Sequence, residues 1–310
     1  MKAFERRFIM ENLNLASLGT EMRNQESARL DELSSLEALR LMNQEDSKVP
    51  QAISKVLPVI NEVVQQVTKV LEAGGRLIYM GAGTSGRLGV LDAVECRPTF
   101  GTSDEQIMGL IAGGKDAMFR ANENIEDQKS SGAADLKAIH LSSKDIVIGI
   151  AASGRTPYVI GGLEYANTLG APTVGLVCNL NSEIKKVAKT TIEVDCGPEV
   201  LTGSTRLKSG TAQKLILNMI STVSMVGLGK VYQNLMVDVQ PTNEKLRERS
   251  LRILMEATGL DKQAAKEVYE QADKNLKVAI LMHLLGVSKA EAQERLSASK
   301  GHVKQALNEH

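Results

Sequence analysis

Three stretches of the chain combine glycine with hydroxyl side chains in a way that suits phosphate binding. The first runs from Gly81 to Gly86, the second from Ala152 to Pro157, and the third from Gly197 to Thr211. Glycine lets the backbone come close to a ligand, and the free N–H groups at a helix start attract anions. One such stretch could be an ordinary helix cap, but three together indicate a single cage around a phosphate.

The expected ligands of the phosphate come from these three loops. Two hydroxyls stand directly before Gly86, which suits a phosphate monoester, and a positive charge would come from Arg206, Lys208 or Lys214. The predicted phosphate-binding residues are Gly83, Thr84, Ser85, Gly86, Ser153, Gly154, Arg155, Thr156, Ser204, Thr205 and Lys208.

The first loop also spells G-x-G-x-x-G, which by itself is a weak signal for a dinucleotide. A dinucleotide site needs an acidic residue about 20 positions later, at the end of the next strand, to bind the ribose. The next expected strand, 107–111, is followed by Ala112-Gly113-Gly114-Lys115, which contains no carboxylate. We therefore favour the phosphate of a small molecule over a dinucleotide or a purely structural turn.

Apolar runs of strand length provide the framework that these loops need. Five strands are expected at 77–80, 107–111, 146–151, 173–178 and 191–195, and helices between them at 84–96, 116–139, 157–169 and 181–189. The alternation predicts an α/β fold with a five-stranded parallel sheet flanked by helices, of Rossmann-like type. Ligands of such sheets bind beyond the carboxyl ends of the strands, where all three loops are expected.

Further helices are expected before the sheet. Residues 1–16 are interpreted as a loose arm, and a helix over 51–72 should be kinked or split at Pro58. Between them, 17–47 is predicted to be one helix, with an apolar stripe formed by Leu30, Leu33, Leu36, Leu39 and Leu41.

The rest of the chain is expected to be helical as well. The predicted helices are 212–228, 242–256, 261–271, 273–285, 288–297 and 301–309. We divide the chain into an N-terminal helical arm (1–50), a phosphate-binding domain (51–250) and a small C-terminal helical module (251–310). The last is interpreted as a unit for packing or subunit contact.

Composition excludes several classes of function. The chain has 310 residues, with 37 Lys and Arg against 37 Asp and Glu, so no bulk charge directs it to nucleic acid or to a membrane. No apolar run reaches transmembrane length, and the N-terminus lacks a signal-peptide pattern. Cys96, Cys178 and Cys196 are expected to be reduced and buried, in a cytoplasmic protein. The four histidines lie away from the glycine loops and from metal-ligand spacing, so neither a metal, a cofactor nor a Ser-His-Asp triad is expected.

The strand–loop–helix unit with its hydroxyls resembles the sugar isomerase (SIS) domain, which binds phosphosugars. Within that group the chain resembles the N-acetylmuramic acid 6-phosphate etherase family from about residue 20 to the C-terminus. The stretches that carry this resemblance are Leu30–Glu37 with Asn43–Asp46, Gly81–Gly89 with Asp92–Cys96, Ile111–Gly114, Gly149–Val159, Thr202–Lys214, Asn234–Asp238 and Thr242–Leu246.

The resemblance implies a bacterial cytoplasmic enzyme of cell-wall recycling. It would cleave the D-lactyl ether of N-acetylmuramate 6-phosphate with water, giving N-acetylglucosamine 6-phosphate and D-lactate. The family works as a homodimer without metal. Its two catalytic acids fall on Glu95 and Glu126, with Glu123 as the alternative to the second.

Ether cleavage becomes accessible through the ring-opened sugar. Its aldehyde at carbon 1 acidifies the proton on carbon 2, so a base can remove that proton while an acid protonates the ether oxygen on carbon 3. Lactate leaves, and water then adds. We expect Glu95 to act as the acid and Glu126 as the base or water activator, with the order of these roles left open. The two carboxyls need environments that separate their pKa values.

The position of Glu95 raises a question of geometry. Ser85 and Glu95 are ten residues apart, or about 15 Å along an unbroken helix, which is longer than a hexose phosphate. Either the helix ends early and turns back, or Glu95 serves the partner subunit's site across a two-fold axis, which we favour. The adjacent Cys96 suggests that Glu95 is buried rather than a solvated carboxylate at a helix end.

Two other functions stay open. A phosphosugar-sensing regulator of the DNA-binding type should carry a basic recognition helix, whereas residues 1–50 hold seven Lys and Arg against nine Asp and Glu. A protein-binding regulator would use the C-terminal module. A phosphosugar isomerase on the same fold would also need a base near carbon 2, so only release of lactate separates it from an etherase.

Overall fold

The computed structural model describes residues 18–120, 125–239 and 244–308. Its centre is a parallel sheet of five strands in the order β2-β1-β3-β4-β5. The strands are β1 (Leu77–Gly81), β2 (Ile107–Ile111), β3 (Ile146–Ala151), β4 (Thr173–Val177) and β5 (Thr190–Glu193). All five lie where the apolar runs predicted them. Every residue of β1, β3 and β4 is buried, because helices cover both faces of the sheet.

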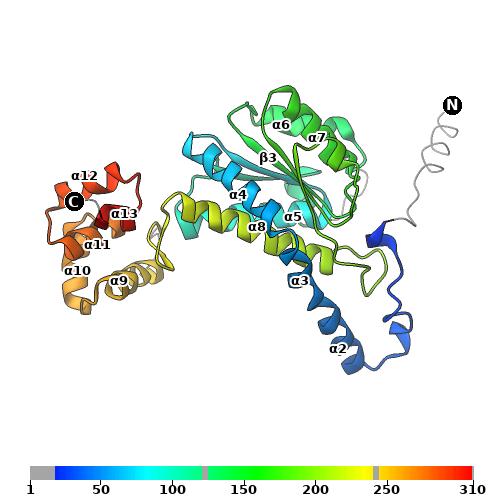
Figure 1. Cartoon of the computed structure of the whole chain (residues 1–310), viewed down its shortest axis with the longest axis horizontal. Coiled ribbons are helices and arrows are strands. Elements are labelled where there is room, and N and C mark those ends of the chain that lie inside the picture. Colours follow the sequence, from blue (N-terminus) through cyan, green and yellow to red (C-terminus); the bar gives the residue numbers. More distant parts are fainter. Residues whose placement is uncertain (1–17, 121–124, 240–243, 309–310) are drawn as a thin grey trace.

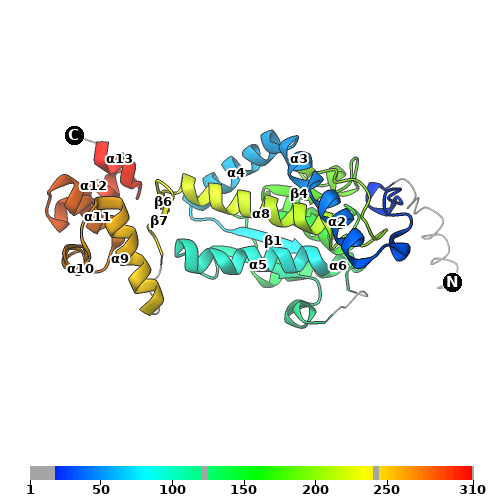
Figure 2. The ribbon, with the colours of Figure 1, turned by 90° about the horizontal axis from the view of Figure 1, so that it is seen from below.

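Alternate side chains of each strand pack into two separate hydrophobic cores, one on each face of the sheet. In β1, Leu77 and Tyr79 join the core beneath α4 (Leu57–Glu72), α5 (Gly83–Phe100) and α8 (Lys208–Gly227). Ile78 and Met80 point the other way, into the core beneath α6 (Lys129–Ala138) and α7 (Pro157–Thr168). The two helical layers are visible in Figure 1, and Figure 2 shows α5 and α8 side by side along β1.

The segment before the sheet corrects the prediction of one helix over 17–47. It contains two short 3-10 turns, η2 (Gly19–Glu21) and η3 (Leu30–Glu32), and only then α2 (Ser35–Asp46). Ser34 starts α2 with a capping box to Glu37, so the helix begins five residues after Leu30. Leu36 and Leu39 are 56% and 62% exposed, so they do not face a core within this chain. The loose arm expected at 1–16 lies outside the described residues.

The predicted break near Pro58 is confirmed. Helix α3 (Lys48–Ser54) ends before α4 begins at Leu57, and Pro58 lies in the first turn of α4. Proline is accommodated there because the first N–H groups of a helix have no partner within it.

Two predicted helices between the strands are wrong. In place of 116–139 the chain forms the short turn η4 (Gly114–Met118) and then α6. In place of 181–189 it forms only η5 (Ile184–Lys186), because the N–H of Ile184 donates to the carbonyl of Gly154 in the loop after β3. Local apolar spacing could not reveal these contacts between loops.

The C-terminal module has a hydrophobic core of its own and stands apart from the sheet in Figure 1. It follows a small hairpin and contains five described helices, all of them at the places predicted. The elements are β6 (Val231–Tyr232), β7 (Leu235–Met236), α9 (Glu244–Thr258), α10 (Lys262–Gln271), α11 (Leu276–Leu285), α12 (Lys289–Ala298) and α13 (Val303–Asn308). The division into 1–50, 51–250 and 251–310 stays a prediction, and α9 crosses its second boundary. Within the described residues, no helix is long and apolar enough to cross a membrane.

Candidate active site at the carboxyl end of the sheet

The strand order brings the first two predicted loops together. β1 pairs with β2 on one side and with β3 on the other. The strand order therefore reverses between β1 and β3, which makes this the topological switch point of the sheet. Such a reversal opens a crevice beyond the carboxyl ends of the two strands, where doubly wound proteins bind their ligands. The loop after β1 and the loop after β3 both lie at this point.

The first loop runs straight into α5. Gly83 is the first residue of this helix, and the preceding Ala82 provides no side-chain cap. A Cβ on Gly86 would lie 2.6 Å from the carbonyl oxygen of Gly81, so only glycine fits at this position. Thr84 is half-buried and Ser85 is buried. The positive end of the α5 dipole therefore carries two hydroxyl side chains in its first turn.

The second loop leads into α7 in a similar way. Gly154 has a φ of +68°, and a Cβ there would lie 2.4 Å from Cβ of Ser182. Thr156 precedes α7 without capping it through its side chain. The Nε atom of Arg155 is buried and has no hydrogen-bond partner in the described part of the chain. This loop thus brings a cationic group with an unused donor to the edge of the sheet.

The third loop lies beside the first. A Cβ on Gly210, in the first turn of α8, would lie 3.4 Å from Cγ2 of Thr84. Ser204 and Thr205 are half-buried just before this turn. The N–H groups of Lys208 and Ser209 are already used, because they donate to the two carboxylate oxygens of Glu199 at 2.9 Å each. An anion held by this loop would therefore depend on its hydroxyls more than on the helix start.

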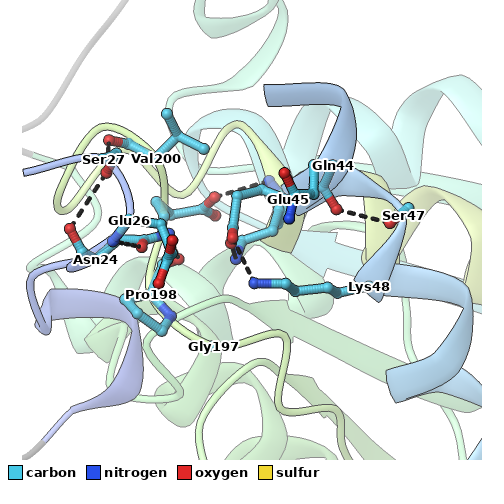
Figure 3. Close-up of polar contacts among 12 residues, drawn as sticks. Asn24, Glu26, Ser27, Gln44, Glu45, Ser47, Lys48, Gly197, Pro198 and Val200 are labelled. Atoms are coloured by element: carbon cyan, nitrogen blue, oxygen red, sulfur yellow. Dashed lines mark hydrogen bonds and ion pairs between the residues drawn. The ribbon is translucent and has the colours of Figure 1, made fainter. Parts of the chain in front are cut away.

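The side chain of Lys208 is engaged by the protein itself. Its Nζ lies 2.7 Å from Oε2 of Glu45 in α2, and both side chains are almost fully buried. Lys48 contacts the other oxygen of the same carboxylate, as Figure 3 shows. Burial alone would raise the pKa of Glu45, but the hydrogen bonds and charges of the two lysines outweigh it and hold the pKa below its ordinary value. In this state Lys208 fastens α2 to the start of α8.

A second set of contacts, which the sequence did not suggest, ties the N-terminal segment to the same loops. We call residues 18–28 the N-terminal strap. Ser27 Oγ donates to the carbonyl of Val200 at 2.8 Å, and Asn24 Nδ2 donates to that of Pro198 at 3.3 Å (Figure 3). The Thr20 N–H donates to Oδ1 of Asn179, whose Nδ2 in turn donates to the carbonyl of Ala152, after β3. The strap thus joins the second loop to the third.

Glu95 lies in the C-terminal third of α5 and is exposed to solvent. The suggestion that it is buried is therefore wrong, because only its neighbour Cys96 turns toward the core. α5 continues through Pro98 to Phe100, which rules out the early end of this helix. The separation of about 15 Å from Ser85 along the axis therefore stands.

Glu126 is half-buried in a turn that lies between η4 and α6. Its carbonyl accepts the N–H of Tyr158, at the start of α7. This bond places the Glu126 turn beside the helix that follows the second loop. The alternative residue, Glu123, lies outside the described residues.

Two further polar side chains support the site and were not predicted as part of it. Asp92 is buried between β1, α5 and α8, and accepts hydrogen bonds from Tyr79, Asn218 and Ser221 at 2.9, 2.7 and 3.1 Å. Burial raises the pKa of its carboxyl. Gln213 of α8 accepts a hydrogen bond from Ser85 Oγ at 2.9 Å. Asp92 stands among apolar residues in the sequence, which was an available signal, whereas the residues around Gln213 give none.

Two family profiles match parts of this chain. A profile of the SIS domain matches residues 122–223, and a profile of the glucokinase regulatory protein N-terminal SIS domain matches residues 59–167. Among solved structures, a phosphoheptose isomerase from Francisella tularensis aligns with 63% of this chain and 100% of its own, at 17% identity and a TM-score of 0.48.

Relatives of much higher identity span nearly the whole chain. N-acetylmuramic acid 6-phosphate etherase 2 of Lactiplantibacillus plantarum is 60% identical over 296 residues, which are 96% of this chain and 100% of the relative. N-acetylmuramic acid 6-phosphate etherase of Bacillus mycoides is 59% identical over 293 residues, 94% of this chain and 100% of the relative. The chain therefore belongs to the N-acetylmuramic acid 6-phosphate etherase family.

Proposed function

We propose that this chain cleaves the D-lactyl ether of N-acetylmuramate 6-phosphate to N-acetylglucosamine 6-phosphate and D-lactate. The observation that carries the proposal is the match, along almost the full length, to relatives named for this activity. The convergence of three hydroxyl-rich loops at one point of the sheet agrees with a phosphorylated substrate.

The substrate phosphate would lie in the crevice between β1 and β3. Hydroxyls and N–H groups of the first loop would bind it, with Ser153, Arg155 and Thr156 on the second side and Ser204 and Thr205 on the third. Arg155 suits this role because its buried Nε lacks a partner in the described structure. Lys208 would act on the phosphate through the position of its loop, since its ammonium group is paired with Glu45.

The reaction would proceed by elimination and then addition. A base removes the proton from carbon 2, the bond between carbon 3 and the ether oxygen breaks, and the departing lactate oxygen takes a proton from an acid. Water then returns a hydroxyl to carbon 3 and a proton to carbon 2. We assign the acid to Glu95 and the base or water activation to Glu126, because a pair of carboxyls in opposite protonation states can perform both proton transfers.

Glu95 would serve the site of a partner subunit. It projects from a continuous helix at about 15 Å from Ser85. The same stretch of α5 carries Leu91 and Val94, which are 49% and 62% exposed in the single chain. Exposed apolar side chains beside a carboxylate are typical of a surface that another subunit covers. A homodimer with shared sites would satisfy both observations.

The first test is release of D-lactate from N-acetylmuramate 6-phosphate by the wild type and by Glu95→Gln. The proposal expects release by the wild type and its loss in the variant. Glu164→Gln, at an exposed carboxylate on α7, serves as the matched control and should keep full activity. A wild type that binds the phosphosugar but releases no lactate would instead indicate a sensor or an isomerase.

A second test separates the two acids. Exchange of the carbon 2 proton with solvent should persist in Glu95→Gln and stop in Glu126→Gln. Exchange that continues without Glu126 would remove its role as the base.

A third test addresses the shared site. A chain carrying Thr84→Ala and Ser85→Ala is mixed with a Glu95→Gln chain after subunit dissociation. If the site is shared, the mixture regains activity because one intact site forms in each mixed dimer. If each site is built from one subunit alone, the mixture stays as inactive as the two variants measured separately.

We also propose that the protein works in the bacterial cytoplasm. Its three cysteines are free and buried, which suits a reducing compartment. Burial raises the pKa of Cys96 to about 12, so this thiol stays protonated and inert at neutral pH.

A further inference from the structure

Two polar groups of α8 are buried without a hydrogen-bond partner in the described part of the chain. They are the Nε2 of Gln213 and the Oγ of Ser209, and each of these residues is only 1% exposed. The two residues are four positions apart, so their side chains lie on the same face of the helix. Buried polar groups are nearly always satisfied in folded proteins, so two of them on one helix face call for an explanation.

The hydroxyl of Ser85 is involved in the same cluster. Its Oγ donates its hydrogen to Oε1 of Gln213 at 2.9 Å. A serine hydroxyl has a single hydrogen. While that hydrogen points at Gln213, Ser85 can offer only lone pairs to a phosphate, and lone pairs repel an anion. The arrangement in the structure is therefore the wrong one for binding the substrate through Ser85.

We propose that Gln213 is a positioning residue, whose side-chain amide turns over when the substrate phosphate binds. In the turned state Nε2 donates to Ser85 Oγ, and Ser85 donates its hydrogen to a phosphate oxygen. Before the amide turns, Nε2 of Gln213 and Oγ of Ser209 do not contact each other, since both lack a partner in the described part of the chain. Ser209, one helical turn away, must therefore also rotate its hydroxyl about χ1 to donate to Oε1 of Gln213. Every orphaned group of the cluster gains a partner, and no covalent bond changes.

The rotation of the Gln213 side-chain amide requires little space. The oxygen and nitrogen of a glutamine amide are nearly equal in size, so exchanging their positions leaves the packing of the side chain unchanged. The position of α8 favours the proposal, because its Gly210 lies against Thr84 of the first loop. The inference rests on the proposed function, since it requires that the first loop binds the phosphate.

Two substitutions of Gln213 separate this role from a static one. Gln213→Glu offers only acceptor oxygens, so it would hold the hydrogen of Ser85 away from the phosphate. We expect it to weaken binding of N-acetylglucosamine 6-phosphate by about tenfold to a hundredfold, the range for a lost hydrogen bond to a charged group. Gln213→Met removes the competing acceptor and leaves Ser85 free to donate, so we expect only a few-fold loss.

A purely structural glutamine predicts the opposite order. If Gln213 served only to accept the Ser85 hydrogen bond, Glu would preserve that bond and Met would break it. Methionine would then be the more damaging substitution. Dissociation constants are measured by titration calorimetry, and a larger loss in Gln213→Met overturns the proposal. Because a carboxylate at position 213 also repels the phosphate by its charge, a larger loss in Gln213→Glu supports the proposal only if that loss disappears in the Ser85→Ala chain.

A double-mutant cycle between Gln213→Met and Ser85→Ala tests whether Gln213 acts through Ser85. The Gln213→Met substitution should have no further effect on affinity in the Ser85→Ala chain, whereas additive losses would contradict a role of Gln213 that acts through Ser85. This cycle also tests the proposal if Gln213→Glu does not fold.

The wild type is measured beside the variants for both sugar-phosphate binding and lactate release. If the wild type shows neither, the proposed function fails. If it shows both, but the affinities of the variants differ from those expected above, only the role of Gln213 fails.

Discussion

Breaking the buried pair between Glu45 and Lys208 should destabilise the protein far more than breaking a surface pair. In Glu45→Gln the ammonium of Lys208 stays buried, with its side chain 1% exposed, and loses the charge that balances it. Removal of one partner from a buried pair costs about 3–5 kcal/mol. Because glutamine keeps one acceptor oxygen, we expect the lower end, about 3 kcal/mol.

The matched control is Glu164→Gln, which breaks the exposed pair with Lys129. Those two side chains are 54% and 44% exposed, and such pairs contribute at most about 1 kcal/mol. The free energy of unfolding is measured by urea titration of the full chain at pH 7. Equal losses in the two variants, or a loss below about 1 kcal/mol in Glu45→Gln, would refute the reasoning.

The effect of pH gives the same prediction an independent check. The pKa of Glu45 is held below its ordinary value of 4.5, so its contribution to stability is full above that pH. It is lost as the pH falls through the lower pKa of the folded state. The difference between wild type and Glu45→Gln should therefore be constant near neutrality and shrink in acid. A difference that grows on acidification would contradict this sign.

A double variant separates anchoring from ligand binding. Replacing Glu45 and Lys208 together by methionine removes both buried charges, and well-packed apolar pairs are often neutral in stability. We expect most of the stability to return. If the affinity for the sugar phosphate also returns, Lys208 acts only by fastening its loop; if affinity stays low, its ammonium contacts the phosphate.

Two further predictions concern the packing of the sheet domain. Gly132→Ala should lower the free energy of unfolding by about 3 kcal/mol. A Cβ at this position would lie 1.9 Å from the carbonyl oxygen of Tyr158 and force α6 away from α7. Thermal melting checks this prediction, with Ser130→Ala, at an exposed position of the same helix, as the control. Burial raises the pKa of Asp92, so the wild type should lose stability relative to Asp92→Asn as the pH rises from about 4 through that raised pKa. Melting temperatures across this range that run parallel for the two proteins would contradict the second prediction.

The parts of the fold that the sequence predicted are those whose signals are local. Each strand is a short apolar run, and the helices of the C-terminal module begin at capping residues such as Asp261, Asn275 and Ser288. The three loops were predicted because parallel strands place their carboxyl ends at one edge. The capping box of Ser34 and Glu37 is also present in the sequence, but the spacing of the leucines around it favours one continuous helix.

The remaining features depend on partners that are remote in sequence. The pair of Lys208 with Glu45 joins positions 163 residues apart, and no local pattern reveals it. The exposure of Glu95 does not follow from its buried neighbour, because one helix turns adjacent residues to opposite environments, and Cys96 faces the core while Glu95 faces outward. The bond from Ser85 to Gln213 spans 128 positions and is evident only in the folded structure.

The N-terminal strap has a consequence for the order in which the protein folds. Its hydrogen bonds from Thr20, Asn24 and Ser27 join residues 159 to 174 positions apart, across the whole sheet. Contacts between such distant residues form late, because a long stretch of chain must be ordered before they close. During synthesis the strap leaves the ribosome early yet waits for residues 198–200 before it can bind. The crevice is therefore completed after the sheet, and recovery of ligand binding during refolding should lag behind recovery of secondary structure.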